Sequence, residues 1–557
     1  MFRKVVRTSS KVLLGTTVLG VGAYGIDSRT EAQLLQRNVR TFYNGVAFAL
    51  DYKLNFRPPR HAGDMDAFDA LHERLANRMF DLFADNGGLY IKMGQAIGTQ
   101  AAMLPPAYQK RARELFDSAP AVPFEVVQRV FMEDNNGLHP NEVFAEFDTK
   151  PIASASIAQV HKARLKNGDW VAVKIQKPAI QKQMNSDLAA FRIILKVYEK
   201  IFDLPLTWSA DYIEKHTRME ADFESEARNA QKAWHFMQQE TSLRDLVYIP
   251  RVYPEFSTKR VLVCEWVDGI QLTDRDKIKS AGLDSEAAMK IAIDAFASQI
   301  FKSGFVHGDP HPGNVLVRPN PKNKSKTQVV IIDHGLYIQE SEKFRLEYCK
   351  LWEALFMLDM KTMNKICESW GIHDSNIFAS ITLQKPFSPN KAVHLGKQTL
   401  NAHDMYELQV NLKHRIKYFL QDQALFPREL IFISRNMNIV RANNKVLGSP
   451  VNRINVMARW AVRGLSVRND PSTHEMAKLS ITQWMRLHIR GTFHTILFDC
   501  SLFLMSLSFW IVKLRERAVS LWKGTASKGF EDILDDKLKE QIQRQFGVVV
   551  DDSIFDA

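Results

Sequence analysis

Four residues that lie far apart in the sequence have the side chains that proteins use to hold a metal ion against phosphate groups. Asp309 and Asn314 stand five positions apart in a segment rich in glycine and proline, and Asp333 directly follows the apolar run 329–332. Carboxylate and amide oxygens are the ligands that Mg²⁺ prefers. Lys174 ends another apolar run and would add a fixed positive charge beside the same phosphates. Together these residues predict a site for a magnesium nucleotide.

The order of these residues matches the nucleotide site of protein kinases. In kinases a strand lysine comes first, a catalytic loop with an aspartate and an asparagine comes next, and an aspartate near a glycine follows. By this match Lys174 would hold the α- and β-phosphates, and Asp309 would orient the phosphoryl acceptor or a water. Asn314 and Asp333 would bind Mg²⁺. Any one of the four could be structural, but their joint order favours a nucleotide-binding, kinase-like fold.

The histidines in the same loop allow a second interpretation. His307, Asp309 and His311 stand at alternate positions, and with His334 they could form the metal cluster of a metallohydrolase. That interpretation leaves the strand lysine without a role. It also leaves unexplained an alanine-rich segment at residues 153–158. The sequence therefore favours the nucleotide site over a histidine-rich metal centre.

The elements that must position these residues can be predicted from the spacing of apolar side chains. Residues 66–130 have the period of helices, with a break at 104–106. The β-type runs are residues 157–164, 170–176, 260–266 and 329–332, with hairpin signals at 166–169 and 320–326. Asp284 is placed to cap a helix that leads to the loop at 307–314. Nearly everything after residue 339 has a helical pattern, so the fold class is α+β.

Three further motifs give the chain a resemblance to the ABC1/UbiB/ADCK atypical kinases, a family also described as coenzyme Q8-like. Residues 92–95 fit its KxGQ motif, residues 151–161 fit its alanine-rich loop, and residues 220–222 fit its ExD motif. With the loop and the aspartate described above, the resemblance covers residues 65–340. The basic N-terminus is most similar to the mitochondrial ADCK1 branch of the family.

The resemblance implies roles for residues that the spacing alone does not single out. The alanine-rich loop would take the place of the kinase glycine-rich loop and contact the nucleotide. Its nucleotide-binding residues would be Ala153, Ser154, Ala155 and Ser156. Because the methyl groups restrict the backbone, nucleotide preference should differ from that of ordinary kinases. Glu226 matches the glutamate that pairs with Lys174, and Glu265 matches the hinge that meets adenine.

The KxGQ motif implies a gate over the site. Lys92, Gly94 and Gln95 would lie in a helix that covers the place where a peptide substrate would bind. In the family this lysine contacts the ExD motif, which is Glu220 and Asp222 here. A protein substrate would then be obstructed.

Two departures from ordinary kinases argue against phosphoregulated protein kinase activity. Gly308 stands where the arginine of the kinase H-R-D motif would be, so nothing there can pair with a phosphorylated activation loop. No Ala-Pro-Glu sequence follows Asp333. A true protein kinase is therefore the least favoured of the kinase readings.

Composition sets the limits of these interpretations. A chain of 557 residues with 45% hydrophobic and 24% charged residues is a folded protein of two or three domains. Four cysteines cannot form a disulfide framework at this length, and we expect their thiols to be buried.

The net charge of +12 is concentrated in two segments that adjoin apolar stretches, residues 1–50 and 451–490. Basic groups in that setting favour an anionic lipid surface over nucleic acid. The first acidic residue is Asp27, as in a mitochondrial transit peptide. The apolar run 12–25 is short of the ~20 residues needed to span a bilayer. Residues 492–512 are long enough, although Asp499 makes a surface-lying or buried helix equally compatible.

The predicted organisation is bilobal and protein-kinase-like, with a helical N-terminal KxGQ extension and a mostly helical C-terminal region. The predicted parts are a targeting segment or anchor (1–26), the KxGQ extension (27–140), a small lobe with an insertion (141–270), a large lobe (271–480) and a C-terminal helical region (481–557).

The predicted function is that of an atypical kinase or ATPase at the mitochondrial inner membrane that supports coenzyme Q or phospholipid homeostasis. Its cofactors would be ATP or ADP with Mg²⁺. Its partners would be the nucleotide and an anionic membrane lipid or a quinone, and no nucleic acid. The alternatives are a non-catalytic pseudokinase that binds lipid or acts as a scaffold, and a protein kinase.

Overall fold

The computed structural model of the protein describes most of the chain between residues 25 and 536. The described residues are 25–27, 29–57, 65–99, 106–114, 121–202, 207–372, 375–383, 426–466, 481–523 and 529–536. The chain divides into two compact units. The first unit consists of Met1–Ala227 and Val252–Trp266. The second unit consists of Arg228–Arg251 and Val267–Ala557. The predicted targeting segment lies outside the described residues except for its last two positions.

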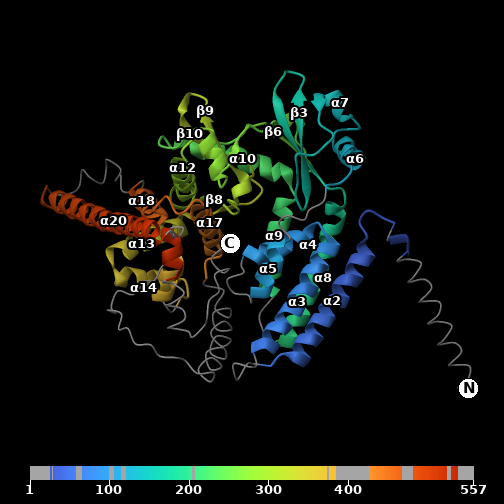
Figure 1. Ribbon diagram of the computed structural model, residues 1–557, viewed down its shortest axis with the longest axis horizontal. Coiled ribbons are helices and arrows are strands. Elements are labelled where there is room, and N and C mark those ends of the chain that lie inside the picture. Colours follow the sequence, from blue (N-terminus) through green and yellow to red (C-terminus); the bar gives the residue numbers. More distant parts are fainter. Residues whose placement is uncertain are drawn as a thin grey trace, which may run out of the picture. The chain divides into compact units, whose positions relative to one another are not determined.

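Helices make up most of the N-terminal part of the first unit (Figure 1). They are α2 (Leu34–Asn55), α3 (Met65–Asn86), α4 (Leu89–Thr99), α5 (Pro106–Glu114), α8 (Ala179–Phe202) and α9 (Thr207–Glu220). An apolar core that includes Leu75, Phe80 and Tyr90 joins α3, α4 and α5. Helix α4 ends before the predicted break at residues 104–106, and α5 begins at its last residue. This part of the helical prediction is therefore confirmed.

An antiparallel sheet completes the first unit, with the order β1-β3-β4-β6 and with β2 paired to β3. Its strands are β1 (Phe144–Phe147), β2 (Ala153–Ser154), β3 (Ala158–Leu165), β4 (Trp170–Gln176) and β6 (Val261–Glu265), with α7 (Pro140–Val143) before β1. Side chains alternate between the two faces of a strand. Val171, Val173 and Ile175 of β4 are buried against α6 (Phe124–Asp134), which leaves Lys174 on the opposite face.

The predicted strands of this sheet are confirmed to within about one residue at each end. The β3–β4 hairpin closes at the predicted turn, where Gly168 has a φ of 96°. A positive φ of this size is open to glycine at no steric cost, which explains the residue at this point of the turn.

The second unit contains two small sheets. A four-stranded sheet has the order β5-β10-β9-β7, and β8 pairs with β11. The strands are β5 (Val247–Tyr248), β7 (Ile270–Gln271), β8 (Phe305–His307), β9 (Val315–Asn320), β10 (Asn323–Ile331) and β11 (Tyr337–Gln339). The predicted hairpin at 320–326 is the connection between β9 and β10.

Most of the other elements of the second unit are helices. They are α11 (Arg275–Ser280), α12 (Ser285–Ser298), α13 (Glu342–Met357), α14 (Met360–Ser369), α15 (Ser375–Leu383), α17 (Glu429–Val446), α18 (Arg453–Ser466) and α20 (Ile481–Lys523). A further helix, α10 (Phe223–Gln239), begins in the first unit and ends in the second. Asp284 caps α12 as predicted, because its carboxylate accepts from the backbone N–H of Glu286 at 2.9 Å.

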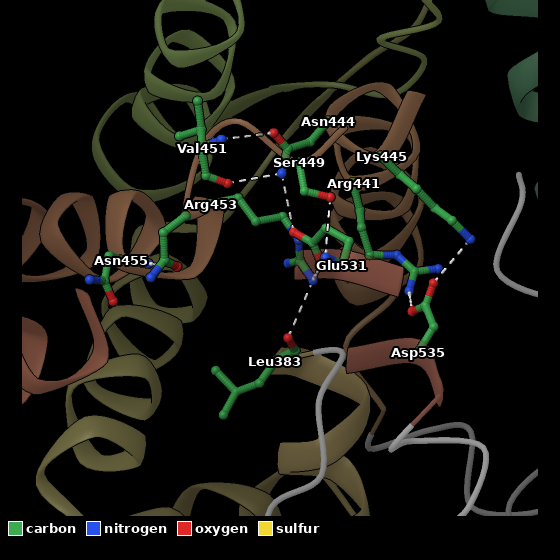
Figure 2. Close-up of polar contacts among 11 residues, drawn as sticks. Leu383, Arg441, Asn444, Lys445, Ser449, Val451, Arg453, Asn455, Glu531 and Asp535 are labelled. Carbon is green, nitrogen blue, oxygen red and sulfur yellow. Dashed lines mark hydrogen bonds and ion pairs between the residues drawn. The ribbon is translucent and has the colours of Figure 1, made fainter. Parts of the chain in front are cut away.

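Two buried ion pairs attach the short helix at residues 530–536 to α17 and α18 (Figure 2). Arg453 Nε lies 2.8 Å from Glu531 Oε1, and the two side chains are 0% and 1% exposed. Arg441 pairs with Asp535, which Lys445 also approaches to 3.3 Å. Burial raises the pKa of Asp535 and lowers that of Arg453, so each charge depends on its partner.

The predicted apolar segment 492–512 lies within α20. Within that helix Ile496–Glu516 has the length and composition of a membrane span, a test that a core helix or a signal sequence can also satisfy. Only 17% of this stretch is buried in the described part of the chain. Cys500 is exposed here and Cys264 is half-buried, so the prediction that all four thiols are buried is wrong.

Candidate functional site

The strand lysine of the first unit forms a close ion pair with the glutamate assigned to it. Lys174 Nζ lies 2.8 Å from both carboxylate oxygens of Glu226, and the two side chains are 19% and 3% exposed. Glu226 lies in the first turn of α10, where the helix dipole favours a negative charge. Nζ also lies 5.1 Å from the centre of the Phe223 ring. The pair therefore presents one oriented ammonium group on the polar face of the sheet.

The alanine-rich loop turns back onto this sheet through β2. Ala153 and Ser154 form β2, and the backbone N–H of Ala155 donates to the carbonyl of Ala158 at 2.8 Å. Ser156 is buried. Among the described residues, nothing hydrogen-bonds the buried hydroxyl of Ser154. The loop thus has a compact backbone and one unused hydroxyl.

A second lysine, which the sequence did not single out, holds this loop. Lys177 Nζ donates to the carbonyl of Ala155 at 2.7 Å. Burial lowers the pKa of Lys177 to about 8. The residue directly follows β4, three positions after Lys174, but no motif marks it because its contact is with backbone.

Two of the predicted gating residues are in contact within the first unit. Lys92 Nζ is 3.2 Å from Glu220 Oε2, so the expected contact between the KxGQ and ExD motifs is present. Asp222 accepts from the hydroxyl of Ser225 at 2.7 Å. Gly94 is buried in α4, and the side chain of Gln95 lies outside the described residues.

His307 organises the loop that carries Asp309 in the second unit. This histidine is fully buried, and burial lowers its pKa. Its Nδ1 accepts from the backbone N–H of Asp309 at 3.0 Å, and its Nε2 lies 2.9 Å from the carbonyl of Asp333. One neutral imidazole therefore ties the predicted catalytic aspartate to the predicted metal-binding aspartate.

Gly308 has a steric reason to replace the kinase arginine. Its backbone N–H donates to the carbonyl of Leu336 at 2.8 Å. A Cβ at this position would lie 2.7 Å from Leu336 Cγ, which is closer than real Cβ contacts come. The loop therefore packs against the segment after Asp333 in a way that only glycine permits.

The two predicted metal ligands are also connected through the backbone. Asn314 ends a short 3₁₀ turn, and its carbonyl accepts from the N–H of Ile332 at 3.0 Å. Asp333 Oδ1 accepts from the N–H of Gly335 at 3.1 Å. In the described part of the chain no protein group hydrogen-bonds the Asn314 side chain. The oxygens of an amide and a carboxylate are ligands that fit a hard cation such as Mg²⁺.

The alternative histidine metal cluster does not form. Both ring nitrogens of His307 are used by backbone groups, and those of His334 contact the Tyr337 hydroxyl at 3.0 Å and the Ile331 carbonyl at 3.1 Å. A histidine must have a free ring nitrogen to bind a metal ion. Among the described residues no group of three or more His, Cys, Asp or Glu side chains is arranged to hold a metal.

Helix α17 supplies three residues to this loop that the sequence reading missed. Arg435 lies 3.1 Å from Asp309 Oδ2, and these side chains are 12% and 19% exposed. Asn436 donates to the His307 carbonyl at 2.7 Å, and Asn443 donates to the Pro310 carbonyl at 3.2 Å. The signal that could have found them is the spacing of Asn436 and Asn443, which are seven residues apart and therefore lie on one face of the helix.

Lys174, Glu226, Glu220, Asp222 and Lys92 belong to the first unit, and Asp309, Asn314 and Asp333 belong to the second. Within each unit the structure brings the predicted residues together. Glu265 ends β6, opposite Val171 of β4, and its predicted role at the adenine stays a prediction.

Known proteins are similar in sequence to most of this chain. Residues 114–367 match the model of the ABC1 atypical kinase-like domain. An ABC1 family protein of Schizosaccharomyces pombe is 41% identical over 84% of this chain and 86% of its own length. AarF domain-containing protein kinase 1 of Xenopus tropicalis is 33% identical over 88% and 92%. A solved Mycobacterium tuberculosis structure, a complex with erythromycin, aligns at 21% identity with a TM-score of 0.42, over 73% of this chain and 98% of that one.

Proposed function

Because this chain belongs to the ABC1 family of atypical kinases, we propose that it binds a magnesium nucleotide and transfers or hydrolyses its terminal phosphoryl group. The predicted α+β kinase-like fold class is confirmed. The observation that carries the proposal is the bidentate ion pair of Lys174 and Glu226, which fixes one ammonium group for phosphate binding.

Each residue has a distinct part in the proposed reaction. Lys174 would neutralise the α- and β-phosphates, and Glu226 keeps its side chain extended toward them. Asn314 and Asp333 would hold Mg²⁺, which when bound neutralises charge on the β- and γ-phosphate oxygens. Asp309 would accept a proton from the attacking hydroxyl or water. Arg435 stabilises the negative charge on Asp309 and fixes its direction.

A thermal shift assay tests nucleotide binding directly. We expect Mg-ATP or Mg-ADP to raise the melting temperature of the wild type. At a nucleotide concentration a hundredfold above Kd, the rise should correspond to a stabilisation of about 2.7 kcal/mol. EDTA should abolish the shift, and so should Asp333→Asn. Asp276→Asn is the matched control, since this carboxylate is exposed in the first turn of α11. The proposal fails if the wild type shows no magnesium-dependent shift.

In the same proposal the protein works at the mitochondrial inner membrane and supports coenzyme Q or phospholipid homeostasis. Its support is the basic N-terminal segment, the apolar run 12–25 and the exposed apolar helix α20. Carbonate extraction of isolated mitochondria tests the location. Quinone and phospholipid levels in cells that lack the protein test the role, and release of the protein with soluble markers would contradict the location.

A non-catalytic role is the second candidate, and the pairing of Asp309 with Arg435 favours it because the proposed base is engaged by a cation. Rescue of deficient cells separates the two candidates. If Asp333→Asn restores lipid levels as well as the wild type does, turnover is unnecessary. If only the wild type and Asp276→Asn rescue, the catalytic proposal stands.

A further inference from the structure

The outward face of α2 is almost entirely apolar. Its seven exposed large apolar residues share one face of the helix, with spacings of three or four positions, and they are 37% to 68% exposed. They are Leu35, Val39, Phe42, Tyr43, Val46, Leu50 and Leu54. The remaining exposed residues of α2 are Lys53 and Asn55. Surface helices of soluble proteins normally place charged and polar side chains on this face.

The opposite face of α2 is tightly held, so the apolar face cannot rotate inward. Arg37 forms a buried ion pair with Asp187 of α8, with Nε 3.1 Å from Oδ1. Thr41 contacts the Tyr90 hydroxyl of α4 at 2.7 Å. A Cβ on Gly45 would lie 2.9 Å from Ile194 Cδ1, which shows how closely α2 and α8 pack.

The apolar face continues onto α8. Figure 1 shows α2 and α8 side by side, and the Tyr198 hydroxyl donates to the Gly45 carbonyl at 2.8 Å. Ile194 and Tyr198 of α8 are the residues that lie against Gly45. The residues directly before them, Ile193 and Val197, are 49% and 45% exposed and lie beside the contact with α2. The surface that we call the α2–α8 face therefore consists of the seven residues of α2 with Ile193 and Val197.

The exposed charges that α2 and α8 themselves carry all have one sign, and the exposed acid Asp211 lies on α9, where it pairs with Arg192 of α8. The exposed ionisable residues of α2 and α8 are Lys53, Lys182, Lys196 and Lys200. The carboxylates of the two helices are instead engaged: Asp51 pairs with Arg74, Asp187 pairs with Arg37, and Glu199 accepts from Thr207. An apolar face whose own two helices expose only lysines among their ionisable residues complements an anionic lipid surface. A two-fold pairing with a second copy would instead bring lysines against lysines.

We propose that the α2–α8 face lies flat on an anionic bilayer, with its apolar side chains in the interface and its lysines at the phosphate groups. A helix of 22 residues is about 33 Å long, which suits a surface-lying element. This inference deepens the membrane part of the proposed function and is independent of nucleotide binding.

Vesicle sedimentation of the full chain tests the proposal. The variant Val46→Gln/Leu50→Gln removes the centre of the face, and Leu138→Gln/Val446→Gln removes two equally exposed apolar side chains elsewhere. With vesicles of phosphatidylcholine and cardiolipin, we expect the first variant to lower the partition coefficient by about tenfold. The control variant should bind as the wild type does. Lys196→Gln/Lys200→Gln should lower binding by about fivefold per lysine at low salt and much less at high salt.

The other outcomes overturn the proposal in distinguishable ways. Equal binding by Val46→Gln/Leu50→Gln and the wild type would place the membrane contact elsewhere, for example on α20. Wild-type dimers that this variant converts to monomers would show that a second copy occupies the face. A magnesium-dependent thermal shift measured on the same samples reports the nucleotide function separately, so its loss would not be mistaken for a failure of lipid binding.

Discussion

Lys174 and Glu226 form one close ion pair, and the carboxylate of that pair is almost fully buried. We predict that Lys174→Met abolishes the Mg-nucleotide thermal shift and lowers the free energy of unfolding by about 3 kcal/mol, since it removes the cation that a nearly buried carboxylate contacts. The double variant Lys174→Met/Glu226→Gln should cost less than the sum of the two single variants, by about 1–3 kcal/mol. Urea unfolding of the four proteins measures this coupling. Additive costs would show that the pair contributes nothing as a pair.

Glu340 is a buried carboxyl group for which no hydrogen-bond partner exists among the described residues. Burial raises its pKa well above 4.5, with Arg345 lowering it in part. Above pH 4.5 the unfolded chain releases this proton while the folded protein keeps it, so Glu340 makes stability fall as pH rises.

We therefore predict that Glu340→Gln stabilises the protein at neutral pH by about 1–3 kcal/mol and leaves it unchanged at pH 4. Melting temperatures measured between pH 4 and pH 8 would show the difference between variant and wild type growing with pH. A constant difference across this range would mean that Glu340 does not titrate abnormally.

At the scale of elements, α17 holds the loop that carries Asp309 in place. Its Asn436 is fully buried and donates to the His307 carbonyl, and Arg435, the residue directly before it, forms an ion pair with Asp309. We predict that Asn436→Ala costs about 1–3 kcal/mol of stability, because it leaves that carbonyl unsatisfied. It should also lower kcat for nucleotide turnover with little change in KM, since the phosphate-binding residues are untouched.

Ser434→Ala is the control for this prediction, because Ser434 is exposed on the same helix. A purely structural role for Asn436 would lower the yield of folded protein while the folded fraction keeps its full kcat. That result would contradict the role of α17 in positioning Asp309.

Elements whose signals are local could be predicted from sequence, and those that depend on distant partners could not. The turn of the β3–β4 hairpin is encoded by four neighbouring residues, 166–169. The cap of α12 is encoded by Asp284 and the residues that directly follow it. Both were predicted. Strands such as β5 and β7 are two residues long and exist only through pairing with β10 and β9, so no periodicity marks them. The same holds for Asn436, which lies 129 positions from its acceptor.

At the scale of the whole molecule, each unit exposes an apolar helix face within the described residues. The α2–α8 face belongs to the first unit and α20 to the second. Composition predicted the second of these but not the first, because the apolar residues of α2 are separated by polar ones and form a face only when wound into a helix.

The second unit is complete only when residues 530–536 have folded onto it. Glu531 is paired with Arg453, 78 positions earlier, and Asp535 with Arg441, 94 positions earlier. Both arginines are at least 95% buried and depend on these carboxylates, so removing the acids leaves two buried cations. The C-terminal helix should therefore contribute to the stability of the entire unit, including α17.

We predict that Glu531→Gln lowers the free energy of unfolding by about 3–5 kcal/mol, because Arg453 is left charged and unpaired in the core. Asp532→Asn on the same helix is the matched control, since its side chain is 32% exposed and pairs with Lys445. Urea unfolding gives the energies, and the double variant Arg453→Met/Glu531→Leu should recover most of the loss because an apolar pair can replace a buried ion pair. If Glu531→Gln unfolds at the same urea concentration as Asp532→Asn, residues 530–536 do not hold the unit together. Because Glu531 also accepts from Asn444 of α17 at 3.3 Å, and α17 carries Asn436, Glu531→Gln should also reduce turnover at temperatures well below its melting point.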